Sequence, residues 1–172
     1  MALSKIDVAN MLTGTVPQGN VANASLGAVT ALPGAIATGK VLQVVRDDTN
    51  SQTSTTSSSY VATNLNVNIT PSSTSSKIFV IVSGFIDQEA ANRAARITIF
   101  RDSTNISSTE LTLNYSTVRI LTPFTIHKLD SPSSTSQINY KLYLKSGSGG
   151  DQVSFNNDSS TRSQITAFEI AG

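Results

Sequence analysis

The sequence contains no cysteine and no tryptophan, and His127 is its only histidine. The absence of cysteine excludes disulfides, thiolate nucleophiles and cysteine-based zinc sites. A single histidine would need partner side chains to form a zinc site, a catalytic triad or a proton relay. Because His127 lies between Ile126 and Lys128 in a strand-like pattern, we interpret it as a solvent-facing or hydrogen-bonded side chain.

Charge is also scarce, and hydroxyl groups take its place. Charged residues make up 13% of the 172 positions, and the formal net charge is +1. Roughly a quarter of all positions are Ser or Thr, well above their usual share. The basic residues are scattered from Lys5 to Arg162, whereas a nucleic-acid-binding protein normally needs a basic stripe. We therefore expect no nucleic-acid partner, and a surface suited to packing against copies of itself.

No segment resembles a membrane span or a secretory signal. The longest apolar run, 78–86, is interrupted by Ser83 and Gly84 and is too short to cross a bilayer. The N-terminus reads Met-Ala-Leu-Ser-Lys-Ile-Asp, without a basic region followed by an apolar core. We expect neither membrane insertion nor export by that route.

The carboxylates do not form a convincing catalytic pair. A glycosidase needs two carboxyl groups that face one sugar, and adjacent Asp47 and Asp48 point to opposite sides of a strand. Asp87 and Glu89 lie at a strand end near two arginines, Arg93 and Arg96, so surface charge pairing explains them. We predict no catalytic residue and no cofactor, and we expect that the protein is not an enzyme.

Two loop segments have some features of ligand-binding sites. Residues 147–150 are glycine-rich but lack the lysine and helix that follow in a phosphate-binding loop, so we interpret them as a hairpin turn. Asp151, Asn156, Asn157 and Asp158 offer oxygen ligands without the spacing of a known calcium loop. No metal ligand is predicted, and a structural calcium ion at this segment is left open.

Residues 1–39 differ from the rest of the chain and are interpreted as an N-terminal arm. They are rich in small residues and carry two charges. Ser4 and Asp7 have the spacing of a short capped helix, and the remainder is typical of an extended segment. Alone in water such a segment has little to bury, so we expect it to be flexible and to attach to another protein. Its anchoring side chains would be Ile6, Val8, Met11 and Leu12.

From Lys40 to Gly172 the apolar pattern has the period of β-strands, and we predict one domain over 40–172. Short apolar or alternating segments are separated by turn residues every ten to fifteen positions or so. The expected strands are 41–45, 59–62, 65–69, 77–86, 97–99, 111–115, 118–126, 138–145, 153–155 and 164–170. The fold predicted is all-β, an antiparallel β-sandwich with a jelly roll as the leading topology.

Three further expectations concern individual segments. The continuous apolar run at 77–86 is typical of a strand covered on both faces. Pro123 indicates an edge position or a bulge in its strand. The Ser/Thr tract at 51–59 is expected to be a surface loop. The predicted core comprises Leu65, Val67, Ile69, Ile78, Val80, Ile97, Ile99, Ile120, Ile126, Leu142 and Ile170.

Several segments resemble a module of bacteriophage virion proteins. The most specific is 69–78, Ile-Thr-Pro-Ser-Ser-Thr-Ser-Ser-Lys-Ile. Residues 39–45, the segment 59–61, Leu129-Asp130-Ser131-Pro132, the strand around Tyr140, and 165–170 are similar to other parts of the same module. This module is often labelled tail-fibre-like and is frequent in phages of cyanobacteria and other aquatic bacteria. Leu3-Ser4-Lys5-Ile6-Asp7 also looks like the short particle-attachment leader of such proteins.

The resemblance implies a structural or adhesive protein of the virion, usually a homotrimer, with its N-terminus toward the particle. Its partners would be the major capsid protein or tail proteins of the same phage, and assembly would take place in the bacterial cytoplasm. Two roles remain open. One is a decoration or cement-like trimer on the head or tail, and the other is a short tail fibre that adheres to a host surface polysaccharide.

Overall fold

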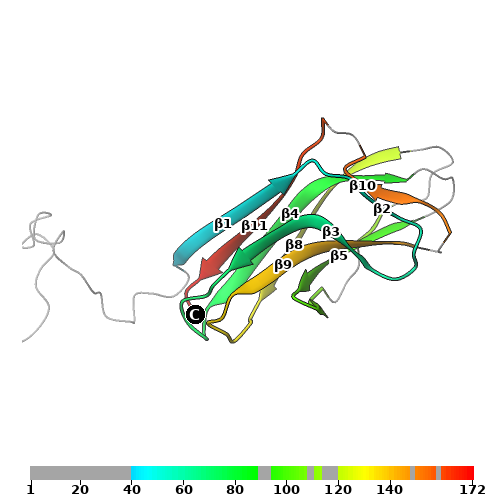
Figure 1. Cartoon of the computed structure of the whole chain (residues 1–172). Coiled ribbons are helices and arrows are strands. Elements are labelled where there is room, and N and C mark those ends of the chain that lie inside the picture. Colours follow the sequence, from blue (N-terminus) through cyan, green and yellow to red (C-terminus); the bar gives the residue numbers. More distant parts are fainter. Residues whose placement is uncertain (1–39, 89–93, 108–110, 114–119, 148–149, 158–159) are drawn as a thin grey trace, which may run out of the picture. The chain divides into compact units, whose positions relative to one another are not determined.

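The computed structural model describes residues 40–88, 94–107, 111–113, 120–147, 150–157 and 160–172. These residues form two antiparallel β-sheets, and no helix occurs within those ranges. Figure 1 shows the two sheets as packed layers. The predicted all-β class is therefore confirmed. The N-terminal arm, including its proposed anchors, lies outside the described residues.

Sheet A is organised around the long strand β4. One side of β4 pairs with β8, and the other side pairs with β11 and then β10. In turn, β1 pairs with β11, and β2 pairs with β10. The strands are β1 (Val41–Thr49), β2 (Thr53–Thr55), β4 (Lys77–Gln88), β8 (Ile120–Asp130), β10 (Val153–Phe155) and β11 (Ser163–Ile170).

Sheet B is built around the pair β9 and β5. Strand β3 pairs with the free side of β9, and the other side of β5 pairs with the short strands β6 and β7. The strands are β3 (Val61–Ile69), β5 (Ala95–Arg101), β6 (Thr104–Asn105), β7 (Leu111–Leu113) and β9 (Ile138–Ser146).

The order of the strands is that of a jelly roll. Strands β1 and β2 follow one another along the same side of the sheet, as do β10 and β11, and β6 and β7 share one side of β5. Each sheet therefore has four strand positions, ordered β1/β2, β10/β11, β4, β8 in sheet A and β3, β9, β5, β6/β7 in sheet B. The first and last strand positions of the chain are neighbours, as in a double Greek key.

Most of the predicted core is buried between the two sheets. In β3 and β4 the inward residues alternate with more exposed ones, as the strand period requires. Ile126 is partly buried and packs against the core. The predicted core residues that are buried are Leu65, Val67, Ile69, Ile78, Val80, Ile97, Ile99 and Leu142.

Two core predictions are wrong. Strand β11 turns Ile165, Ala167 and Glu169 inward, so Ile170 lies on the opposite face and is only half-buried. Ile120 is 36% exposed because it pairs with Gln88, the last residue of β4, at the end of the sheet. The buried residue near the C-terminus is thus a glutamate instead of an isoleucine.

The expectation that 77–86 is covered on both faces is also wrong for the described residues. The inward side chains of β4 are buried, whereas Phe79, Ile81 and Phe85 on the outer face are half-buried. No second layer made of described residues covers that face. The strand is flanked on both sides by neighbours, and these alone account for its partial burial.

The predictions for Pro123 and for two loop segments were confirmed in part. Pro123 lies in β8, an edge strand of sheet A, as expected, and the pairing of β4 with β8 has no register shift. The predicted hairpin at 147–150 is wrong, because the flanking strands β9 and β10 belong to different sheets and do not pair; residues 148–149 themselves lie outside the described residues. Gly150 has a φ of 83°, a conformation that favours glycine. The 51–59 tract is a loop except for strand β2.

We expect Val80→Asp to prevent folding, because Val80 is fully buried at the centre of β4. A buried carboxylate without a partner costs several kcal/mol, comparable with the roughly 5–15 kcal/mol that stabilises a typical domain. Asn64→Asp on the exposed side of β3 is the control and should melt like the wild type. A soluble Val80→Asp protein with a cooperative thermal transition would show that β4 is misplaced.

Candidate interaction surfaces

The described residues do not assemble a metal centre or a histidine-based active site. His127 lies on the outer face of β8, exposed to solvent as predicted, with its ring centroid 5.8 Å from that of Phe79. No group of three or more histidine or acidic side chains is close enough to hold a metal ion in the described ranges. No helix in the same ranges is long and apolar enough to cross a membrane.

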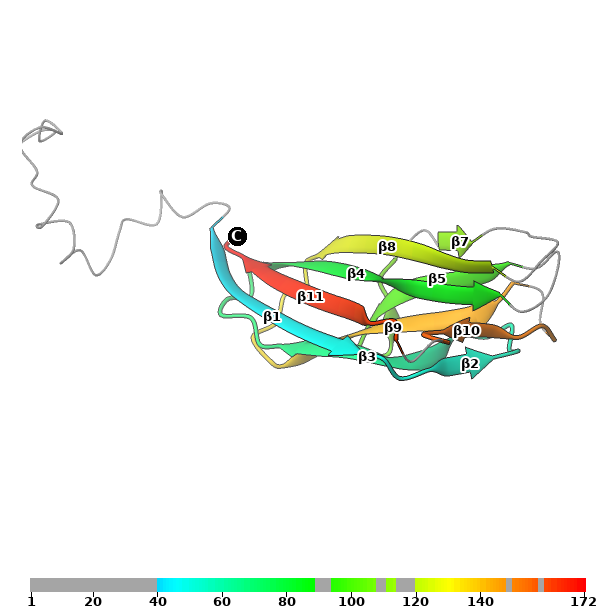
Figure 2. The same ribbon diagram turned by 90° about the horizontal axis from the view of Figure 1, so that it is seen from above.

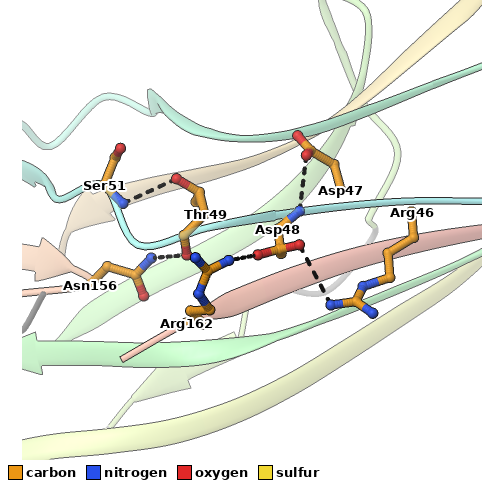
Figure 3. A network of polar contacts seen from close by, with 7 residues as sticks. All are labelled: Arg46, Asp47, Asp48, Thr49, Ser51, Asn156 and Arg162. Atoms are coloured by element: carbon orange, nitrogen blue, oxygen red, sulfur yellow. Dashed lines mark hydrogen bonds and ion pairs between the residues drawn. The ribbon is translucent and has the colours of Figure 1, made fainter. Parts of the chain in front are cut away.

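The pair Asp47 and Asp48 belongs to an exposed polar network at the end of β1, shown in Figure 3. Asp48 forms an ion pair with Arg162, and its Oδ1 atom lies 3.5 Å from Nη2 of Arg46. Asp47 Oδ1 accepts a hydrogen bond from the backbone N–H of Asp48 at 2.9 Å. These carboxylates are engaged in local contacts, which supports a structural role for them.

Asn156 and Asn157, two of the candidate calcium ligands, take part in hydrogen bonds at this end of the domain. Asn156 donates from Nδ2 to the backbone carbonyl of Thr49 at 2.9 Å, and its Oδ1 accepts from the Ser163 hydroxyl at 2.6 Å. Asn157 donates to Oδ2 of Asp87 at 2.7 Å. The prediction that Asp87 lies at the surface is wrong, since its side chain is only 2% exposed. Glu89, Arg93 and Asp158 lie outside the described residues.

Glu169 is a fully buried carboxylate that the sequence analysis did not single out. Its Oε1 accepts hydrogen bonds from the backbone N–H of Ser72 at 2.7 Å and from the hydroxyls of Ser72 and Ser76 at 2.6 and 2.7 Å. Its Oε2 accepts from Gln43 Nε2 at 2.6 Å, and Gln43 also donates to the carbonyl of Thr70. The serine-rich loop between β3 and β4 therefore encloses this carboxylate.

The hydrogen bonds determine the ionisation of Glu169. Burial favours the neutral acid, but the donors on Ser72, Gln43 and Ser76 outweigh burial and lower the pKa of Glu169 to about 2 from 4.5. The side chain is consequently ionised at neutral pH, where charge-assisted bonds link β11, β1 and the loop.

A second buried polar contact ties the two sheets together at one end. Asp130, at the end of β8, accepts two hydrogen bonds from Nη1 of Arg101 at 3.1 and 2.9 Å. Its Oδ2 also accepts from the hydroxyl of Tyr140 at 2.7 Å. Burial and this bond to Asp130 raise the pKa of the Tyr140 hydroxyl. Since β8 is in sheet A and Arg101 and Tyr140 are in sheet B, the contact fixes the relative position of the layers.

The outer face of sheet A carries an apolar row that crosses all four strand positions. Val44 of β1 pairs with Phe168 of β11, Phe168 pairs with Phe79 of β4, and Phe79 pairs with Leu129 of β8. The rings of Phe79 and Phe168 have centroids 6.3 Å apart. Figure 2 shows β1, β11, β4 and β8 lying side by side in this layer. We call Val44, Phe168, Phe79 and Leu129 the apolar row.

The two ends of the apolar row are strongly exposed. Val44 is 54% exposed and Leu129 is 48% exposed, although both are large aliphatic residues. Val41 and Leu42 extend the surface along β1, with exposures of 49% and 43%. Large exposed apolar patches are unusual on monomeric soluble proteins, so this surface is a candidate interaction site. The apolar character of β4 was visible in the sequence. The strand pairing that aligns these four residues was not.

The attachment residues predicted from sequence, Ile6, Val8, Met11 and Leu12, lie outside the described residues, so their role stays a prediction. The apolar row was missed as a site for a different reason. Its members come from four segments of the chain, and each segment alone reads as an ordinary strand.

The sequence matches no protein-family model and no curated protein. Among solved structures it is similar to VP2 of infectious bursal disease virus. For the VP2 subviral particle the TM-score is 0.43 at 18% identity, over 76% of this chain and 33% of that chain. For the Gx strain of the virus the TM-score is 0.44 at 18% identity, over 76% of this chain and 32% of that chain. For the T=1 particles derived from the virus the TM-score is 0.39 at 13% identity, over 75% of this chain and 36% of that chain.

The chain therefore spans about a third of the VP2 chains that it matches. The jelly-roll assignment rests on the order of the strands in the two sheets.

We expect Glu169→Gln to lower the free energy of unfolding by about 2–3 kcal/mol at pH 7, because it weakens several charge-assisted hydrogen bonds at a buried site. The folded pKa lies below the unfolded value, so this stabilisation is complete above pH 4.5 and is lost as the pH falls toward 2. Urea denaturation of both proteins between pH 2 and 7 measures the difference in their free energies of unfolding. This difference should decrease as the pH falls from 7 to 2.

Asp48→Asn is the matched control, since Asp48 is a partly exposed carboxylate whose ion pairs are worth at most about 1 kcal/mol. A pH-independent difference for Glu169→Gln, or an equal effect of Asp48→Asn, would contradict the role given to Glu169.

Proposed function

We propose that this chain is a structural, non-enzymatic subunit of a bacteriophage particle. It assembles as a homotrimer through the outer face of sheet A and attaches to the particle by the arm at residues 1–39. The observation that supports this proposal most directly is the apolar row, which is accessible to solvent in the single chain.

The sequence of β4 supports an additional cover for sheet A. Apolar side chains occupy both faces of this strand, with Val80 and Val82 turned inward and Phe79 and Ile81 turned outward. A half-buried strand would normally carry polar residues on the outer side. Two-sided apolar character is therefore better explained by a second surface that covers the outer face after assembly.

A second copy of the chain is the occupant that fits this face best. The row reaches both edge strands of sheet A, so its apolar ends are accessible to a neighbour beside the sheet as well as above it. No charged residue interrupts the row. Most soluble oligomers have closed symmetry, in which identical patches bury one another or converge on an axis.

The sequence resemblance supports the placement of such a subunit in a phage particle. The segment most similar to phage virion modules, 69–78, includes the serines that enclose Glu169. This segment therefore has a defined structural task, which a chance Ser/Thr run would lack. The resemblance also supports a trimer whose N-terminal arm points toward the particle, and its tail-fibre-like label favours the short tail fibre as the alternative role.

The full chain should be a homotrimer of about 54 kDa, three times 18.1 kDa, at micromolar concentration. Val44→Lys and Leu129→Lys each place a charge in the apolar row and should shift the population toward monomer. Multi-angle light scattering measures the mass. Asn64→Lys, on the exposed outer face of sheet B, is the control and should remain trimeric. A monomeric wild type, or trimers of unchanged stability in both row variants, would rule out this interface.

Deletion of residues 1–38 should leave the β-domain folded, with a melting temperature close to that of the full chain, because the core is formed by residues after Lys40. The same deletion should abolish incorporation into particles. Quantitative mass spectrometry of purified particles measures occupancy. Normal occupancy of the truncated protein would place attachment on the β-domain, and unfolding of the truncated protein would place the arm within the fold.

Copy number separates the two roles within this proposal. A decoration protein occupies a repeated lattice and is present in many copies, whereas a short tail fibre is present in few. We favour decoration because the apolar row and the compact domain suit lateral packing.

A further inference from the structure

Sheet A ends in two long strands, β1 and β8, each of which has a neighbour on one side only. Strand β1 pairs with β11 and β8 pairs with β4, and neither pairs with any other strand of the described residues. Figure 2 shows β1 and β8 at opposite margins of the layer. A free edge of this length presents a row of backbone N–H and C=O groups that can pair with another strand.

The backbone groups on the free side of β8 follow from one hydrogen bond of β4. Phe85 of β4 pairs with Pro123 of β8, and the carbonyl of Phe85 accepts from the N–H of Asn156, next to β10, at 3.3 Å. Phe85 therefore points away from β8, and Pro123 points to the free edge, where its missing N–H is harmless. The pairing of β4 with β8 has no register shift, so alternate residues share this direction. They are Thr125, His127 and Leu129.

The free side of β1 follows from two hydrogen bonds. The carbonyl of Thr49 accepts from Nδ2 of Asn156, in the segment that joins β10 to β11, so Thr49 points toward β11. The N–H of Asp48 donates instead to Oδ1 of Asp47, as expected for a residue that points to the free edge. The register shift of this strand lies earlier, at 41–43. The residues that point to the free edge are Val44, Arg46 and Asp48.

The two edges are complementary in direction and in face. Three antiparallel pairings separate β1 from β8, so the two strands run antiparallel to each other. On both strands, the residues with free backbone groups are also those whose side chains lie on the outer face with the apolar row. A β8 strand beside the β1 strand of a second copy can therefore place Leu129 opposite Val44 with hydrogen bonds and faces in phase. A shift by one residue would put them out of phase.

We propose that sheet A of one chain continues into sheet A of the next by antiparallel pairing of β8 with β1, with Leu129 opposite Val44. This inference rests on the trimer proposed for the chain and names the strands that form its contact. Leu129 and Val44, which are 48% and 54% exposed in the single chain, then contact each other. Because the contact joins two different edges, it is heterologous and can close a ring after three copies.

Two features favour β1 over a second β8 as the partner. In the proposed register Pro123 lies beyond the end of β1, so every backbone donor on the paired part of β8 is retained. Two β8 strands paired symmetrically at Thr125 would instead place Pro123 opposite His127 in each half of the contact, with the loss of a hydrogen bond. The proposed register also brings Lys128 diagonal to Asp47 on the other face, within reach of its long side chain.

Engineered disulfides test the pairing in a chain that has no cysteine of its own. His127 would lie opposite Arg46 of the next chain, with about 5.5 Å between Cα atoms, which a disulfide can span. Within one chain three strand spacings, roughly 14 Å, separate the same residues and exclude a disulfide. Oxidised Arg46→Cys/His127→Cys should give covalent species of about 36 and 54 kDa, two and three times 18.1 kDa, on a non-reducing gel.

Asn64→Cys/His127→Cys is the matched control, because Asn64 is exposed on the outer face of sheet B. It should remain at 18.1 kDa on the same gel, as should His127→Cys alone. Light scattering of the reduced proteins should give the mass of the wild-type trimer for all three variants.

Charge reversal tests the register independently. Asp47→Lys places a like charge near Lys128 and should weaken association by up to roughly fivefold, and Lys128→Asp in the same chain should restore it. Asp47→Lys with unchanged association would contradict this register.

The outcomes separate the pairing from the trimer itself. A trimeric double variant that forms no cross-link would contradict the β8–β1 contact and leave the trimer standing. A monomeric wild type would contradict both. Cross-linking of His127→Cys alone would assign the free edge of β8 to a second β8 strand.

Discussion

The fold depends on β4 more than on any other element. This strand is hydrogen-bonded along its whole length to β8 on one side, and to β11 and β10 on the other. Every strand position of sheet A is therefore placed relative to it, and its inward side chains meet sheet B in the core. Because its outward side chains are apolar as well, the strand that organises the fold also creates a surface that favours an additional cover.

The two outer faces of the sandwich differ in chemistry. Sheet A presents the apolar row, of which Val44 and Leu129 are the most exposed members. Sheet B presents amides, cations and aromatic rings. Both faces lie outside the core, because the core of a jelly roll is formed between its sheets.

Hydroxyl groups replace charge in stabilising the interior of this protein. Glu169 is held by serine hydroxyls, a side-chain amide and a backbone N–H. Asp130 shows the other solution, since it bonds to Arg101 as well as to the Tyr140 hydroxyl. A composition rich in Ser and Thr and poor in charge is consistent with such sites, where short donors converge on one buried acceptor.

The sequence by itself determined the fold class, the position of most strands and the inward residues of β3 and β9. These features follow from the alternation of apolar and polar residues, which is local and has the period of a strand. Pro123 also indicated an edge position or a bulge in its strand, because proline cannot donate a backbone hydrogen bond, and β8 is an edge strand of sheet A.

Only the tertiary structure decided which residues meet across strands. The burial of Glu169 depends on a loop about 97 positions away, and the apolar row and the contact between Tyr60 and Phe100 each combine segments that are remote along the chain. The exposure of Ile120 and the inward turn of Glu169 in place of Ile170 were set by strand ends and pairing register. Register is a property of two strands together, and a shift by one residue reverses the face of every side chain.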